Sequence, residues 1–125
     1  MRLDQKQLRK IELERRRGWI LHLLYVAKPK PIDFKSLLKL LDARNMPMSC
    51  WQFAEKLDFL RSAGLLRVFP LGSDGALSEV EQAKLIQRYC ESDGELDDDY
   101  SAKITNRGIN FQEGQFEEDG VTRVN

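Results

Sequence analysis

The residue types that most often carry out catalysis are few and isolated in this sequence. The single histidine, His22, lies in the apolar stretch 19–26, where a hydrogen-bonded histidine in or beside the core is the ordinary interpretation. Cys50 and Cys90 have neither CxxC nor Cys/His spacing, which predicts two reduced thiols in an intracellular protein. The sequence has no P-loop, dinucleotide fingerprint or nucleophile elbow. We therefore expect a protein that is not an enzyme and that uses no metal and no cofactor.

A run of carboxylates from Glu91 to Asp99 has the composition of a calcium loop without its spacing. An EF-hand requires acidic or amide residues at alternate positions, then a glycine, and a glutamate at the twelfth position. The run lacks this frame, so we expect a solvated acidic loop. Such a loop repels phosphate groups. It either points away from a nucleic acid or engages a basic surface on a protein partner.

Opposite charges are concentrated in opposite halves of the chain. The 125 residues include 20 basic and 20 acidic side chains, but residues 1–70 contain 15 basic against 7 acidic, and residues 71–125 contain 5 against 13. The basic half can attract a polyanion, although the sequence pI near 6.6 is below that of a typical DNA-binding domain. No stretch is long and apolar enough to span a membrane, and the first residues are too polar for a signal peptide. We expect one domain located in the cytoplasm.

The beginning of the chain predicts a long helix with two different halves. Residues 3–27 contain no proline, and Gly18 is the only breaker, so the segment forms one helix or two helices joined there. Residues 5–17 are mostly charged, whereas residues 19–26 are apolar nearly all round, as in a helix surrounded by core. The prolines of Lys28-Pro29-Lys30-Pro31 end this helix. We expect its second half to be buried and its first half to be exposed.

Two shorter amphipathic helices are predicted next. Asp33 is the expected N-cap of a helix over residues 34–45, and Ser49 is the expected N-cap of a helix over residues 50–63. Gly64 is placed where a left-handed residue ends a helix at the lowest cost. The inward faces consist of aromatic and leucine side chains, namely Phe34, Leu37, Leu38 and Leu41 in the second helix and Phe53, Leu57 and Leu60 in the third.

The second half of the chain changes from helical to strand periodicity. Residues 65–71 and 100–105 have the composition and alternation of two strands, which we pair as a hairpin. The 28 residues between them are too many for an ordinary hairpin loop. Ser78 with Glu81 forms a capping box for an inserted helix that ends near Cys90.

This order of elements resembles that of the winged helix-turn-helix superfamily. In that superfamily the third helix commonly ends in L-x-x-L-x-x-x-G-L-[LI], and the second wing strand runs into L-T-x-x-G. The chain matches these patterns at Leu57, Leu60, Gly64, Leu65 and Leu66, and at Ile104-Thr105-Asn106-Arg107-Gly108. In its size, its basic first helix and its Ser-initiated third helix, the chain is most similar to the small winged-helix proteins of Mu-like phages and prophages.

The resemblance implies an α+β fold that is mainly helical, with a small β-hairpin and a helix inserted in the wing. The expected organisation is a basic helical extension over residues 1–17 and a winged-helix domain over residues 18–114, followed by a frayed tail over residues 115–125. The wing insertion covers residues 72–99 and carries the acidic loop. DNA-binding relatives more often have a short basic hairpin in its place.

The resemblance also implies a DNA-binding surface centred on the third helix, which enters the major groove in this superfamily. The helix would present Ser49 and Gln52 at its start, with Gln52 reading adenine and Lys56 turned outward to meet a phosphate. The remaining expected phosphate contacts are Lys28, Lys30, Lys35, Lys39 and Arg67. The more ordinary interpretation of each lysine is a solvated side chain that has no ligand.

Two other features leave alternatives open. Trp51 lies roughly opposite Phe53 on the helical wheel, and we expect the N-terminal segment or the inserted helix to cover it. If Trp51 is exposed, it favours a protein interface, because large aromatic residues dominate interface hot spots. Three interpretations of the basic segment 8–17 remain open. It is a phosphate-tracking arm, a dimerising helix that has only Leu8 and Ile11 in its seam, or a solvated helical extension.

The sequence therefore leaves two binding functions. The first is a phage or prophage regulator that binds double-stranded DNA as a homodimer, so that two third helices reach successive major grooves. The second is a winged-helix module that binds a protein partner through Trp51, the inserted helix and the acidic loop. The resemblance of fold favours the first function, although one fold can support both.

Overall fold

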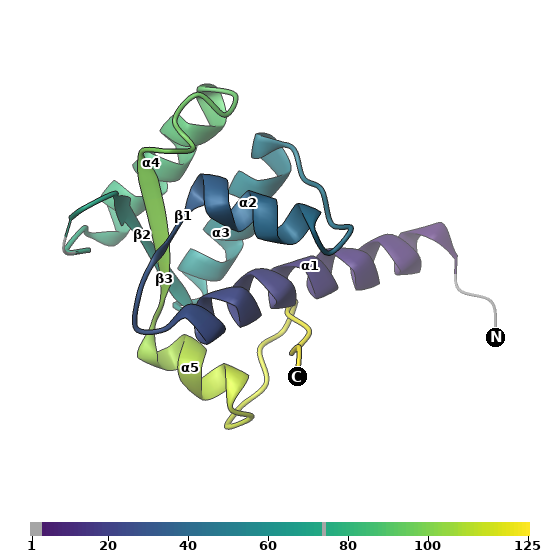
Figure 1. Ribbon diagram of the computed structural model, residues 1–125. Coiled ribbons are helices and arrows are strands. Elements are labelled where there is room, and N and C mark those ends of the chain that lie inside the picture. Colours follow the sequence, from purple (N-terminus) through teal and green to yellow (C-terminus); the bar gives the residue numbers. More distant parts are fainter. Residues whose placement is uncertain (1–3, 74) are drawn as a thin grey trace.

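A computed structural model describes residues 4–73 and 75–125 and has an α+β fold, in which helices surround a small antiparallel sheet (Figure 1). The helices are α1 (Gln5–Ala27), α2 (Phe34–Asp42), α3 (Cys50–Ser62), α4 (Glu79–Glu91) and α5 (Asn106–Gln112). The strands are β1 (Ile32–Asp33), β2 (Leu66–Pro70) and β3 (Tyr100–Ile104). Over the described part of the chain, no helix combines the length and the apolar character needed to cross a bilayer.

The sheet has the strand order β1-β3-β2, with β3 in the centre. The expected hairpin is confirmed, since β2 and β3 pair antiparallel from Leu66 opposite Ile104 to Pro70 opposite Tyr100. Strand β1 was not predicted, because its two residues are too few to show an alternating pattern. It pairs with β3 through Ile32 opposite Ala102 and thereby ties the start of α2 to the sheet.

The expected helix caps are confirmed. The side chains of Asp33, Ser49 and Ser78 each accept a hydrogen bond from a backbone N–H in the first turn of the helix that follows. These bonds satisfy donors that a helix leaves unpaired at its start. Gly64, just after α3, has a φ of 78°, which is the left-handed conformation expected there.

Helix α1 is a single unbroken helix, and its two halves differ as predicted. Residues 5–11 are exposed beyond the body of the molecule, whereas Ile20, Leu21 and Leu24 are buried in the core (Figure 1). Leu3, the expected first residue, lies outside the described residues. Gly18 does not interrupt the helix. It provides space for the backbone of Thr122, which crosses α1 at this point.

The C-terminal residues are held against the body, so the expectation of a frayed tail is wrong. Arg123 donates to the carbonyl oxygens of Phe111 and Phe116, both at 2.7 Å, and the Thr122 N–H donates to Glu14 O at 3.1 Å. Val121 is buried. The polar composition of the tail gave no sign of these bonds, because most of them are made to backbone carbonyls that belong to distant segments.

We predict that Gly18→Ala destabilises the protein, although alanine is the better helix former by about 1 kcal/mol. A Cβ atom at position 18 would lie 1.7 Å from the carbonyl oxygen of Thr122, so the tail must move away from α1. The expected net loss is about 1–3 kcal/mol in the free energy of unfolding, measured by denaturant titration. An unchanged or increased stability would show that the tail does not pack on α1.

Candidate functional site

The inward face of α3 is the predicted one, and its outward face is acidic. Phe53, Leu57 and Leu60 are fully buried. The exposed residues of the helix are Trp51, Gln52, Glu55, Asp58 and Ser62. This face therefore carries two carboxylates and no basic side chain. A helix of this kind has no complement for the phosphate groups that flank a major groove.

Lys56 is not on the exposed face, so the expectation that it is turned outward is wrong. Its exposed fraction is 5%, and its ammonium lies 3.4 Å from the carbonyl oxygen of Gln52 in the preceding turn. Position 56 is three residues after Phe53, so it shares the face that packs towards the interior. Burial lowers the pKa of the Lys56 ammonium, because the charged form loses hydration.

The polar start of α3 is occupied by its own cap. Ser49 Oγ accepts from the Gln52 N–H at 3.1 Å, and Gln52 Oε1 accepts from the Ser49 N–H at 3.0 Å. An adenine contact requires the amide oxygen of Gln52 to accept from the base, so it would compete with this capping box. The spacing Ser-x-x-Gln was visible in the sequence and is the signal that predicts such a box.

Trp51 is exposed, so the expectation that another part of the chain covers it is wrong. Its exposed fraction is 63%. The inserted helix α4 packs beside α3 rather than over Trp51, and a groove of about 380 Å³ lies between the two helices. The groove is lined by Trp51, Ala54, Glu55 and Asp58 of α3 and by Ala83, Ile86, Gln87 and Cys90 of α4. We call it the α3/α4 groove.

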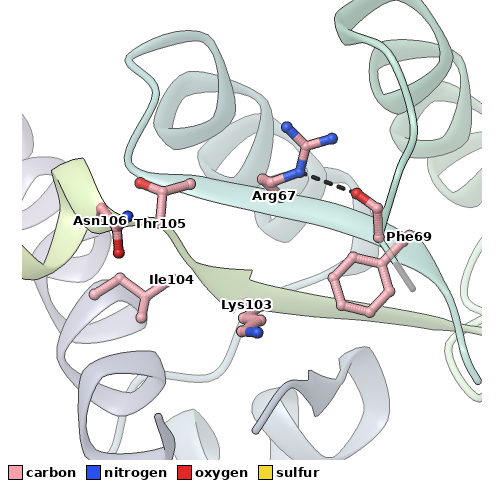
Figure 2. A pocket seen from close by; sticks show the side chains of 7 residues that line it. Arg67, Phe69, Lys103, Ile104, Thr105 and Asn106 are labelled. Carbon is pink, nitrogen blue, oxygen red and sulfur yellow. Dashed lines mark hydrogen bonds between the residues drawn. The ribbon is translucent and has the colours of Figure 1, made fainter. Parts of the chain in front are cut away.

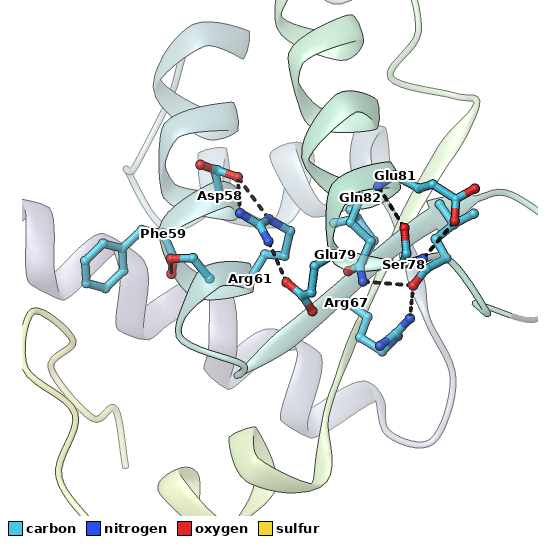
Figure 3. A network of polar contacts seen from close by, with 11 residues as sticks. Asp58, Phe59, Arg61, Arg67, Ser78, Glu79, Glu81 and Gln82 are labelled. Atoms are coloured by element: carbon cyan, nitrogen blue, oxygen red, sulfur yellow. Dashed lines mark hydrogen bonds and ion pairs between the residues drawn. The ribbon is translucent and has the colours of Figure 1, made fainter.

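Polar contacts join α3 and α4 at both ends of the α3/α4 groove. At the end of α3, Arg61 pairs with Asp58 at 2.9 Å and with Glu79 at the start of α4 at 2.6 Å (Figure 3). At the start of α3, Cys50 Sγ donates to Asp93, just after α4, at 3.1 Å. The two helices therefore run antiparallel. Burial, with Asp93 adding to it, raises the pKa of the Cys50 thiol, which favours its protonated form.

The acidic loop does not point away from the start of α2. The Lys35 N–H donates to Asp97 O at 3.0 Å, and its ammonium lies 3.4 Å from a carboxylate oxygen of Asp98. The insertion over residues 79–99 carries eight acidic and two basic side chains. Negative charge therefore lies beside the starts of α2 and α3, which are the ends that a DNA-reading helix pair presents to the duplex.

The other predicted phosphate contacts lie on three different segments. Lys39 is exposed on α2, where it and Lys35 line the same surface hollow. Lys28 and Lys30 are exposed in the connection between α1 and β1. Arg67 lies on β2 and donates to backbone carbonyls of the segment before α4, with Gly75 O at 3.1 Å. The structure does not bring the predicted residues together around α3.

The basic segment of α1 is partly bound to the rest of the molecule. Arg16 donates to Pro47 O at 2.8 Å, and Arg17 stacks on Phe59 with 3.7 Å between its guanidinium and the ring centre. By contrast, no ion pair is found for Lys6, Arg9 or Lys10 among the described residues, and all three are exposed. Leu8 and Ile11 lie in the same exposed turns.

His22 has the structural environment that was expected of it. Its ring packs edge-on against Trp19 at 5.3 Å between centroids, and its Nδ1 lies 3.4 Å from the amide nitrogen of Gln112. Cys50 and Cys90 are free thiols. Within residues 4–73 and 75–125, no three histidine, cysteine or acidic side chains gather in a way that could hold a metal ion.

Comparison of the chain with models of protein families, with curated proteins and with solved structures finds no match.

We predict that Trp51→Ala changes the free energy of unfolding by no more than about 0.5 kcal/mol, as is usual for an exposed side chain. The matched control is Phe53→Ala, two residues away on the buried face, which should cost about 3–5 kcal/mol. Denaturant titration of both variants measures the difference. Equal losses would mean that Trp51 is part of the core.

We predict that Lys56→Met stabilises the protein at pH 7, because it replaces a buried cation with an apolar side chain of similar length. The pKa of Lys56 is lowered on folding, so the unfolded chain binds more protons and the wild type gains stability as the pH rises towards 10.5. The advantage of the variant should therefore shrink between pH 7 and 10.5. Melting temperatures of the two proteins across this range test the prediction, and a constant difference would contradict it.

Proposed function

We propose that the chain is a winged-helix module whose α3/α4 groove binds a helix of a partner protein. The winged-helix assignment is supported by three helices followed by a β2–β3 hairpin and by the strand order β1-β3-β2. The hairpin connection contains α4, which forms one wall of the groove. The inserted helix is therefore the element that gives this module its binding surface.

The observation that carries the proposal is the exposure of Trp51 beside an apolar groove. A tryptophan that is 63% exposed adds little to folding, yet it is the side chain that most often anchors a protein interface. Ala54, Ala83 and Ile86 supply the apolar walls. Val80, also 63% exposed, lies one turn before Ala83 and extends the apolar surface along α4.

The charge of the groove defines the chemistry of its partner. Glu55 lines the groove, is exposed and forms no ion pair within the described residues, and Glu91, outside the lining, lies at the end of α4. A helix that inserts apolar side chains at positions three and four apart would place lysines or arginines on its flanks opposite these carboxylates. The proposed partner is therefore an amphipathic helix with basic flanks.

Binding of DNA by α3 is less well supported than binding of a partner helix in the α3/α4 groove. The exposed face of the helix carries Glu55 and Asp58, and the acidic loop lies beside the start of α2. These groups oppose the counterion release that supplies most of the affinity for DNA. Lys35, one of the few basic groups near this end, is already paired with Asp98.

A homodimer is a second candidate that one observation favours. The exposed turns of α1 carry Leu8 and Ile11 next to Lys6, Arg9 and Lys10, which is the chemistry proposed for the partner. The exposed α1 segment of a second copy therefore has the chemistry to occupy the α3/α4 groove in place of a partner helix. Sedimentation velocity at increasing protein concentration measures this self-association, and Leu8→Glu should weaken it.

The proposal is tested with a synthetic amphipathic peptide that has leucines at every third and fourth position and lysines on the flanks. We predict that it binds the protein and shifts the Trp51 emission to shorter wavelength, because it removes the indole from water. A peptide with glutamates in place of the lysines is the matched control and should bind at least about tenfold more weakly. Glu55→Lys, which replaces the carboxylate of the groove lining that forms no ion pair within the described residues, should reduce this preference.

Two results would contradict the proposal. One is the absence of binding by either peptide at low salt. The other is tight binding of a DNA duplex that weakens steeply with salt and is lost in Lys35→Glu, Lys39→Glu, since this result would place the ligand on α2 and α3 as a DNA reader does.

A further inference from the structure

A second, chemically different hollow lies on the sheet, away from the α3/α4 groove. Two adjoining depressions of about 510 and 370 Å³ share Lys103, Ile104 and Asn106 in their linings. The first also contains Arg67 and the ring of Phe69, as Figure 2 shows, and the second contains Lys28 and Ile109. We call the two together the sheet hollow.

Among the residues that the structure describes, the lining of the sheet hollow contains three cations, Arg67, Lys103 and Lys28, and no carboxylate. Arg67 and Lys103 are direct cross-strand partners in the β2–β3 pair. Like charges in this position destabilise a sheet unless a counter-charge is present. Within residues 4–73 and 75–125, the hydrogen bonds of Arg67 go to neutral carbonyl oxygens and Lys103 forms no ion pair. Among these residues, no carboxylate pairs with either cation.

Two described acidic side chains on neighbouring elements, Asp33 and Glu113, have other partners. Asp33 pairs with Ser101 on β3, two residues from Lys103, and its carboxylate accepts from the Ser36 N–H as the cap of α2. Glu113 accepts from the Tyr25 hydroxyl at 3.1 Å. The ammonium of Lys28 lies over the ring of the same tyrosine, 3.7 Å from the ring centre. Neither carboxylate forms an ion pair with a cation of the sheet hollow.

We propose that the sheet hollow binds the sugar-phosphate backbone of a single-stranded nucleic acid. One phosphate needs one or two of these cations. Arg67 lies in the first depression, Lys28 in the second and Lys103 in both, so the cations follow the hollow as the phosphates of a strand would. Pro29 is the exposed apolar residue of the lining and suits a sugar or a base, whereas Ile104 and Phe69 are each only 5% exposed. The exposed amide of Asn106 adds a donor and an acceptor for base edges.

The sheet hollow is a separate site from the groove proposed to bind a partner helix. The sheet hollow and the α3/α4 groove have no lining residue in common, and they differ in the sign of their charge. The sheet hollow contains two of the residues expected from the sequence to contact phosphates, Lys28 and Arg67, and adds Lys103, which was not predicted. The alternating pattern of a strand predicts which of its residues face solvent. It does not show which residue of the neighbouring strand lies opposite each of them.

The test uses the full chain and a fluorescent eight-nucleotide thymidine strand, titrated at several salt concentrations. We expect binding with a salt slope of about −2, as three phosphate contacts on a single strand predict. Inorganic phosphate and a mononucleotide should bind at least about tenfold more weakly than the strand, because each offers fewer contacts. Lys103→Glu should weaken strand binding about tenfold or more. Its melting temperature should be no lower than that of the wild type, because the variant places a carboxylate opposite Arg67 and removes the like-charge pair.

The matched control is Lys84→Glu, which makes the same charge change at an exposed site on α4 and should leave strand binding nearly unchanged. Equal weakening by Lys84→Glu and Lys103→Glu would overturn the proposal, because binding would then follow net charge. So would the absence of strand binding at low salt, or mononucleotide binding as tight as that of the strand. Peptide binding in the α3/α4 groove should be the same in Lys103→Glu and wild type, so the two proposals fail separately.

Discussion

Contacts among three buried aromatic rings hold α2, α3 and α4 in one arrangement. The ring centroid of Phe34 lies 5.5 Å from that of Phe53 and 5.0 Å from that of Tyr89, and the planes are nearly perpendicular. All three rings are fully buried, so α4 cannot leave α3 without exposing them to water. The α3/α4 groove, and with it the proposed function, depends on this cluster.

The position of α4 changes the chemistry that α3 can offer. A helix that follows a turn and precedes a hairpin can serve as a DNA reader if its outer face is open and its surroundings are basic. Here α4 provides an apolar wall beside that face, and the insertion brings an excess of carboxylates to it. Basic residues gather on the sheet instead, around Lys103. The two proposed sites therefore differ in sign because the insertion separates the charges.

Local patterns in the sequence predict most of the fold, because they report interactions between near neighbours. The capping residues Asp33, Ser49 and Ser78 and the left-handed Gly64 could all be placed correctly. The same patterns predict which face of α3 is buried, except at Lys56. A lysine is assigned outward from its charge, whereas the burial of Lys56 depends on tertiary packing that a local pattern does not report.

The candidate sites were harder to predict, because they are formed by residues far apart in the chain. Whether Trp51 is covered depends on the exact path of α4, which helical periodicity does not determine. The order of the C-terminal residues depends on Arg123 reaching carbonyls of another segment. The meeting of Arg67 and Lys103 requires the register of the hairpin, which its long connection leaves open.

Nuclear magnetic resonance of the isotopically labelled protein can locate the surface that a basic amphipathic peptide contacts. If the peptide binds in the α3/α4 groove, we expect its addition to shift the signals of the Trp51 indole N–H and of the methyl groups of Ala83 and Ile86, with little change at Lys35 and Lys39. Changes confined to α2 and the amide of Gln52, produced by a DNA duplex and not by the peptide, would contradict the proposed function.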